Sequence, residues 1–114
     1  MALAANVFKT ITYIAPTNPV GIYTAPAGYT GVVLLAQIAN IDSLPHTVSF
    51  SHKRTTSGIA VTTEIVKDFA IEGNDSVSLI HGKLTLQSGD VLVLSASNSS
   101  NIKFIGSVLE TLNS

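Results

Sequence analysis

Short runs of apolar and β-branched residues recur along this chain, and small groups of turn-forming residues separate them. The runs occupy residues 7–14, 20–24, 30–41, 46–52, 60–71, 76–86, 91–96 and 102–112. No long stretch places apolar residues three and four positions apart, as an amphipathic helix would, although the end of the last run also suits a helix. The pattern therefore predicts an all-β protein, an antiparallel β-sandwich of jelly-roll or immunoglobulin-like form.

Nothing in the chain divides these runs into separate units. There is no linker and no internal repeat, and 114 residues make one domain of ordinary size. We therefore expect a single β-sandwich domain over residues 1–114, with an N-terminal arm at residues 1–8. Residues 53–58, which are mostly polar, are expected to form a loop or hairpin tip, and Gly82 is expected to mark a bulge or bend.

Charged residues are scarce. They make up 11% of the chain, whereas soluble domains carry about 25%. Ser, Thr, Asn and Gly take their place, and hydroxyls and amides cost less to remove from water than charges do. This composition favours a chain that neighbouring subunits cover; a weakly charged monomer is the alternative.

Residues 30–41 form the longest run, and both of its alternating faces are apolar. One face consists of Val32, Leu34, Ala36 and Ile38, and the other of Val33, Leu35 and Ala39. A sandwich core covers only one face of such a strand, so the second needs another cover. We therefore predict that Val33, Leu35 and Ala39 contribute to a contact with copies of this chain, most simply a trimer, or with another subunit. Alternatively, loops or residues 2–8 cover that face.

No combination of residues indicates catalysis or a bound cofactor. The chain has no cysteine, no Gly-x-Ser-x-Gly motif and no phosphate-binding loop. The segment at residues 87–93 is similar to a cupin turn, but His46 and His52 would lie about 20 Å apart on an extended strand, too far for one metal ion. The prediction is a protein that is not an enzyme, with no catalytic, cofactor-binding or metal-binding residues.

The charge distribution and the lack of long apolar runs argue against nucleic-acid and membrane partners. The net charge is −1 and Lys53-Arg54 is the one adjacent basic pair, whereas nucleic-acid binding needs a clustered basic surface. No run of about 18 apolar residues could cross a membrane as a helix, and the first residues lack the positive charge of a secretory signal. We therefore expect neither a nucleic-acid partner nor a membrane partner.

Two tyrosines could form a weak ligand site. Tyr23 and Tyr29 stand on either side of the predicted turn at residues 25–28, and aromatic rings at such positions can stack on sugars. The alternative is that they are packing residues whose hydroxyl groups reach water. A carbohydrate-binding module used for attachment is accordingly the second class of function that we consider.

Four segments resemble parts of small virion structural proteins of tailed bacteriophages, especially cyanophages. They are IYTAPAGY at residues 22–29, VLLAQIAN at 33–40, GKLTLQSGD at 82–90 and SVLE at 107–110. The resemblance implies an all-β component of the virion, made in the host cytoplasm. It also implies contacts with the major capsid protein, as a capsid decoration protein, or with tail, neck or baseplate proteins. It carries no active-site residues.

Overall fold

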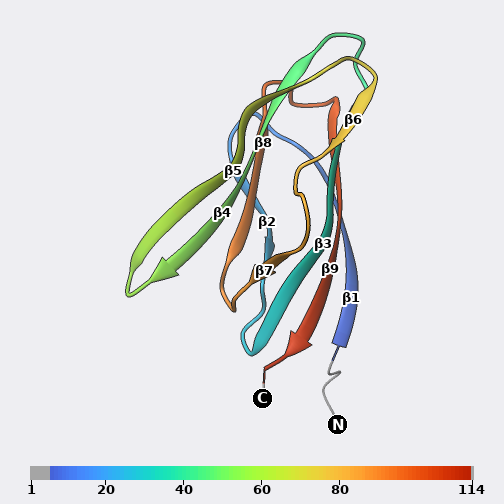
Figure 1. Cartoon of the computed structure of the whole chain (residues 1–114). Coiled ribbons are helices and arrows are strands. Elements are labelled where there is room, and N and C mark those ends of the chain that lie inside the picture. Colours follow the sequence, from blue (N-terminus) through green and yellow to red (C-terminus); the bar gives the residue numbers. More distant parts are fainter. Residues whose placement is uncertain (1–5, 114) are drawn as a thin grey trace.

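The computed structural model describes residues 6–113, which form nine β-strands (Figure 1). The strands are β1 (Asn6–Ile14), β2 (Val20–Thr24), β3 (Tyr29–Asn40), β4 (His46–Thr56), β5 (Ile59–Ile71), β6 (Asp75–Ser78), β7 (Leu84–Leu86), β8 (Val91–Ala96) and β9 (Ile102–Leu112). Of the expected N-terminal arm, residues 1–5 lie outside the described residues, and residues 6–8 belong to β1.

Two antiparallel sheets face each other. The first sheet has the order β1-β9-β3-β6, with β7 also paired to β3, and the second has the order β2-β8-β4-β5. Because β6 and β7 pair with β3 one after the other, they act as a single interrupted strand. If β6 and β7 are counted as one strand, successive strands pass from one sheet to the other everywhere except at the β4–β5 hairpin, which is the jelly-roll arrangement. The predicted antiparallel sandwich is confirmed, and it takes the jelly-roll form.

The core lies between the sheets. Phe50 of the second sheet stacks on Phe104 of the first, with ring centroids 5.6 Å apart. Each strand that crosses the core alternates buried and outward-facing residues, most regularly β8 and β9. The buried apolar residues of both sheets form one cluster, which is typical of a single domain.

A β-bulge in β3 changes which residues face the core. Val33 pairs with Val108, but Leu35 pairs with the next residue of β9, Ser107, so Leu34 is an extra residue. The alternation of sides therefore shifts at this point. Val33 is 1% exposed and lies in the core, whereas Leu35 is 37% exposed and faces outward. The predicted grouping of Val33 with Leu35 on one outer face is wrong for this reason.

Residues 53–58 form the end of a hairpin, as one of the two predicted alternatives had it, and most of them are strand rather than loop. β4 continues to Thr56, β5 begins at Ile59, and only Ser57 and Gly58 turn the chain. Both have positive φ, 52° and 80°, as a two-residue hairpin turn of type I′ requires. The end of this β4–β5 hairpin stands away from the body of the molecule (Figure 1). β9 is also strand throughout, without a helical end.

Candidate functional site

The outer face of the first sheet carries five of the large exposed apolar side chains of the described chain. We use this name for the outward-facing residues of β1, β3 and β9. Register places Phe8, Leu109 and Val32 side by side across the three strands. Further along the face lie Leu34, Leu35, Ile105 and Ile14.

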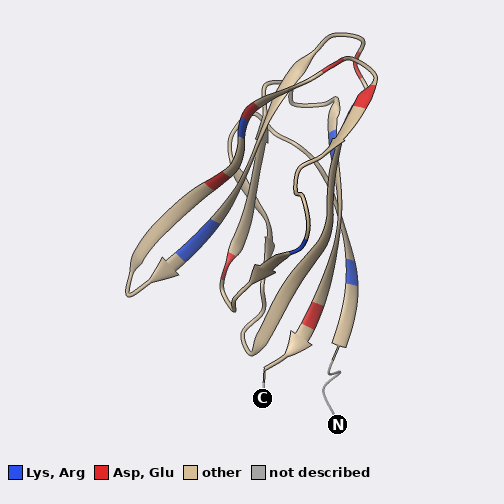
Figure 2. Ribbon diagram, viewed as in Figure 1, with Lys and Arg blue, Asp and Glu red and all other residues tan. Residues whose placement is uncertain are grey.

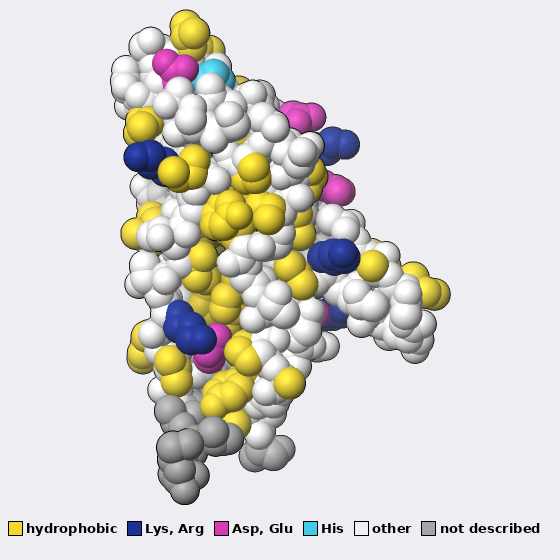
Figure 3. All heavy atoms as spheres, turned by 180° about the vertical axis from the view of Figure 1, so that it is seen from behind, with side chains coloured by type: hydrophobic (Ala, Val, Ile, Leu, Met, Phe, Trp, Pro, Cys, Tyr) yellow, Lys and Arg dark blue, Asp and Glu magenta, His cyan; other side chains and the backbone are white. Residues whose placement is uncertain are grey.

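Charge is almost absent from this face. Buried and outward residues alternate along β9, so Lys103 points outward and is the one charged residue among the outward positions of these three strands. Figure 2 shows that only a small part of the chain carries charge. Seen from behind, hydrophobic side chains form a band down the middle of the molecule, and a positive and a negative side chain lie together beside its lower part (Figure 3). A surface of this kind can be covered by another protein without burying charge.

The large apolar side chains of this face are well exposed to solvent. Phe8 is 74% exposed, Ile14 52% and Ile105 45%. Monomeric soluble proteins rarely expose contiguous apolar patches larger than a few hundred Å². The outer face of the first sheet is therefore the candidate interaction surface, and it contains Leu35 and Ala39 of the predicted interface but not Val33.

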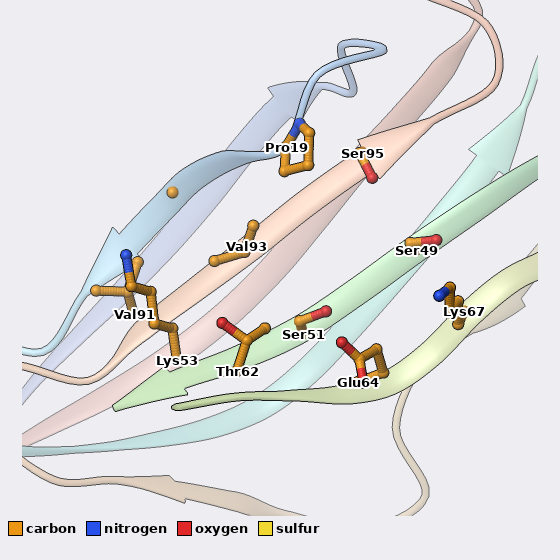
Figure 4. A pocket seen from close by; sticks show the side chains of 11 residues that line it. Pro19, Ser49, Ser51, Lys53, Thr62, Glu64, Lys67, Val91, Val93 and Ser95 are labelled. Atoms are coloured by element: carbon orange, nitrogen blue, oxygen red, sulfur yellow. The ribbon is translucent and has the colours of Figure 1, made fainter. Parts of the chain in front are cut away.

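The outer face of the second sheet is chemically different. It is hollowed into a groove of about 610 Å³, in which Ser49, Ser51 and Ser95 lie on β4 and β8 (Figure 4). The charged side chains of Glu64 and Lys67 line the β5 side of the groove. Lys53 and the hydroxyl group of Thr62 also line it, and no aromatic ring does, so the groove offers hydrogen bonds but no stacking platform for a sugar.

Tyr23, one of the two predicted ligand residues, connects the two sheets. Its hydroxyl donates a hydrogen bond to Oε2 of Glu110 on β9, and Nζ of Lys9 lies 3.2 Å from the other carboxylate oxygen. Burial, together with the hydrogen bond and the charge of Glu110, raises the pKa of Tyr23 well above its ordinary value. This geometry matches the packing alternative for Tyr23.

Tyr29 lies at the start of β3, and its backbone is engaged. The N–H of Tyr29 donates to the carbonyl of Pro26, and its carbonyl accepts a hydrogen bond from the hydroxyl of Ser88. Because Tyr23 is held between the sheets, the two tyrosines do not make a shared exposed platform. The carbohydrate site on these residues stays a prediction without support from the geometry.

Asp90 is the centre of a buried polar network that the sequence analysis missed. Nε and Nη2 of Arg54 donate to its two carboxylate oxygens at 2.9 and 2.7 Å, and Nε2 of His52 lies 2.9 Å from Oδ2. The backbone N–H of Gln87 also donates to Oδ2. The Arg54 guanidinium, aided by His52 and Gln87, holds the pKa of the Asp90 carboxyl well below its usual range although burial opposes this. The network fastens the base of the β4–β5 hairpin to the turn before β8.

The histidines lie in separate surroundings. His46 lies 2.8 Å from a carboxylate oxygen of Asp42, and this hydrogen bond lowers the pKa of that carboxyl. His52 belongs to the Asp90 network and His81 to the loop between β6 and β7. Among residues 6–113, no group of three or more His, Cys, Asp or Glu residues is placed to hold a metal ion. In the same residues no helix is long and apolar enough to cross a membrane.

Comparisons with known proteins give structural neighbours only. No protein-family model matches the chain, and no curated protein matches its sequence. A chain in the acid-stable capsid of Helicobacter pylori bacteriophage KHP30 matches with a TM-score of 0.57 and 14% identity. A chain of the T13 particle of infectious bursal disease virus matches with a TM-score of 0.55 and 9% identity. The fold of this chain is a capsid-like jelly roll.

The two neighbouring chains differ in the share of their own length that the jelly roll occupies. The match covers 97% of this chain and 90% of the KHP30 capsid chain. It covers 96% of this chain but only 32% of the bursal disease virus chain. A jelly roll of this size is thus nearly a whole chain in the first particle and about a third of a chain in the second.

Proposed function

We propose that this protein is a capsid decoration protein of a phage, a non-enzymatic component that stabilises the particle through protein–protein contacts. The observation that carries the proposal is the combination of a capsid-like jelly roll with an almost uncharged apolar outer face on the first sheet. A subunit of this kind needs a stable fold and a complementary surface, and it needs no catalytic group.

The size of the KHP30 neighbour supports a small separate subunit. Its chain, found in a capsid, is little longer than the jelly roll itself. The phage resemblance found in the sequence points to the same class of particle. We therefore propose the major capsid protein as the partner and the virion as the location.

The outer face of the first sheet is the proposed contact with the capsid. Leu35 and Ile105 are exposed there, and covering apolar surface contributes about 25 cal/mol per Å². The polar groove of the second sheet would then face solvent. A tail, neck or baseplate subunit would need the same kind of surface, so the experiment must separate these locations.

The first prediction tests this contact with particles that lack the protein. Purified protein is added back, and binding is followed by co-sedimentation. Wild type is expected to bind to saturation and to raise the temperature at which the capsid releases its DNA. Leu35→Lys places a charge within the apolar face and should weaken binding at least about tenfold, the equivalent of about 1.4 kcal/mol.

Thr62→Lys is the matched control. It adds the same charge to the groove on the outer face of the second sheet, and binding should be unchanged. Mass spectrometry of separated heads and tails then locates the native protein. Recovery in tails alone, or equal binding by Leu35→Lys and wild type, would contradict the decoration role.

A further inference from the structure

β1 is the least protected strand edge in the described chain. It pairs with β9 in unbroken register from Asn6↔Thr111 to Ile14↔Lys103, and no described strand lies on its other side (Figure 1). Edge strands usually carry charges, proline or bulges that prevent further pairing. The one charged residue of β1, Lys9, is held by the buried carboxylate of Glu110.

The other long edge strand shows the usual protection. β5 contains Glu64, Lys67 and Asp68, and its pairing with β4 shifts register twice. Asp68 also has a positive φ of 49°. β1 has one charged residue, Lys9, which is paired with Glu110, and it has no register shift, so its outer edge is open to a further strand.

The outward-facing residues of β1 are nearly symmetric about Ile11, whereas the inward-facing Lys9 and Tyr13 differ. Reading outward, Thr10 corresponds to Thr12, Lys9 to Tyr13 and Phe8 to Ile14. An antiparallel partner of the same sequence, centred on Ile11, would place Thr opposite Thr and Phe8 opposite Ile14. Thr–Thr and aromatic–β-branched pairs are among the favourable cross-strand pairs.

We propose that β1 pairs antiparallel with β1 of a second copy, with the two-fold axis at Ile11. This contact joins the two first sheets into one continuous sheet. It covers parts of Phe8 and Ile14, which are 74% and 52% exposed in the single chain. The two-fold symmetry gives a dimer rather than the trimer expected from the sequence.

Other registers lose these pairs. A shift of two residues places Phe8 opposite Thr12 or Pro16 and so separates it from Ile14. A shift of one residue places the outward side of one copy level with the inward side of the other. That shift would put the two second sheets on opposite sides of the joined sheet and interrupt the apolar outer face. The pairing centred on Ile11 keeps this face continuous across both copies.

The dimer does not depend on the proposed virion role, because it is a property of the purified protein. It would nevertheless strengthen that role. A continuous outer face built from two copies offers two equivalent contacts with the particle, and linked contacts bind more tightly than single ones.

The second prediction tests the dimer with charges at Thr10 and Thr12. Both are exposed, and their neighbours on β9, Ser107 and Ile105, are uncharged. In Thr10→Lys/Thr12→Lys each new lysine faces a lysine of the second copy. Sedimentation equilibrium at low salt should show a dimer for wild type and a dissociation constant raised about tenfold or more for this variant.

Thr10→Lys/Thr12→Glu is the matched control for the same positions. Each lysine then faces a glutamate of the second copy, so this variant should remain dimeric. Circular dichroism should show the β-sheet spectrum of wild type for both variants, which separates loss of pairing from loss of folding.

Cysteine cross-linking tests the register, because the chain contains no cysteine. Thr10→Cys mixed with Thr12→Cys should form a disulfide-linked pair under mild oxidation, since directly opposite residues are within disulfide range. Either variant alone should form much less.

Three results would overturn the proposal. These are a monomeric wild type, a trimer insensitive to Thr10→Lys/Thr12→Lys, and equal dissociation of both charge variants.

Discussion

At the scale of single residues, the buried charges of this protein serve its structure. Asp90 is 2% exposed and its carboxylate is satisfied by Arg54, His52 and the backbone of Gln87. Glu110 is 3% exposed and is held by Tyr23 and Lys9. These paired charges fix which strand ends lie together.

The third prediction concerns Asp90→Asn. The substitution removes the negative charge that Arg54 and His52 contact while it leaves the size of the side chain almost unchanged. We expect the free energy of unfolding to fall by about 2–3 kcal/mol, the contribution of hydrogen bonds to a charged group, as measured by urea denaturation. Glu64→Gln, at an exposed position on β5, should change it by about 0.5 kcal/mol or less.

The same network makes stability depend on acid pH. The pKa of Asp90 is lower in the folded chain than in the unfolded chain, because Arg54 stabilises the charged form. The stabilisation is therefore complete above the unfolded value of about 4 and is lost as pH falls toward the folded value. Urea denaturation of wild type below about pH 4 should show this loss. An equally steep loss in Asp90→Asn would assign the effect to other carboxylates.

At the scale of elements, the β4–β5 hairpin extends beyond the rest of the second sheet. Its last β8 partner is Val91, opposite Lys53, so the strands beyond that point form a two-stranded ribbon. Ile59 and Val61 of this ribbon are 68% and 59% exposed. Isolated ribbons are only marginally stable in water. The type I′ turn at one end of the ribbon and the Asp90 network at the other therefore determine how the ribbon projects from the second sheet.

The fourth prediction tests the turn. Gly58 has a φ of 80°, where a side chain is strained, and a Cβ there would meet no other atom within 4 Å. Gly58→Ala should therefore lower the free energy of unfolding by about 1 kcal/mol through backbone strain alone. Ser57→Asn is the control, because asparagine tolerates positive φ, and it should leave stability unchanged or slightly higher. Equal effects of the two substitutions would contradict the type I′ turn.

At the scale of the whole molecule, contacts between the sheets hold the sandwich together. Phe50 and Phe104 stack across the core, and each belongs to a different sheet. Above and below this core the two outer faces differ, one apolar and almost uncharged, the other hollowed and lined with hydroxyl groups. This difference gives the protein a side suited to contact and a side suited to water.

The fifth prediction is that the central contact decides global stability. Phe50→Ala should lower the free energy of unfolding by about 3–5 kcal/mol, since it leaves a cavity between the sheets, and Phe50→Leu should lower it much less. Phe69→Ala, at a side chain that is 44% exposed, should cost about 1 kcal/mol. Thermal unfolding followed by circular dichroism compares the three. Similar midpoints for Phe50→Ala and Phe69→Ala would show that the core is not the main source of stability.

The sequence by itself determined the all-β class, the antiparallel sandwich and most strand positions. These features follow from local alternation of apolar residues and from turn chemistry, which neighbouring residues specify together. β2, β8 and β9 have the boundaries predicted for them. The scarcity of charge, which motivates the search for an interaction surface, is also visible in the sequence.

The tertiary structure alone decided which residues face outward and which charges meet. The bulge at Leu34 places Leu35 on the outer face while Val33 lies in the core, because one extra residue reverses the sides of the residues that follow it. Asp90 and Arg54, which are 36 positions apart in the chain, meet because β4 and β8 are neighbours in the second sheet. The open edge of β1 likewise exists only because the sheet ends there. Local sequence patterns do not specify such long-range pairing, because it depends on how the strands are ordered in the two sheets.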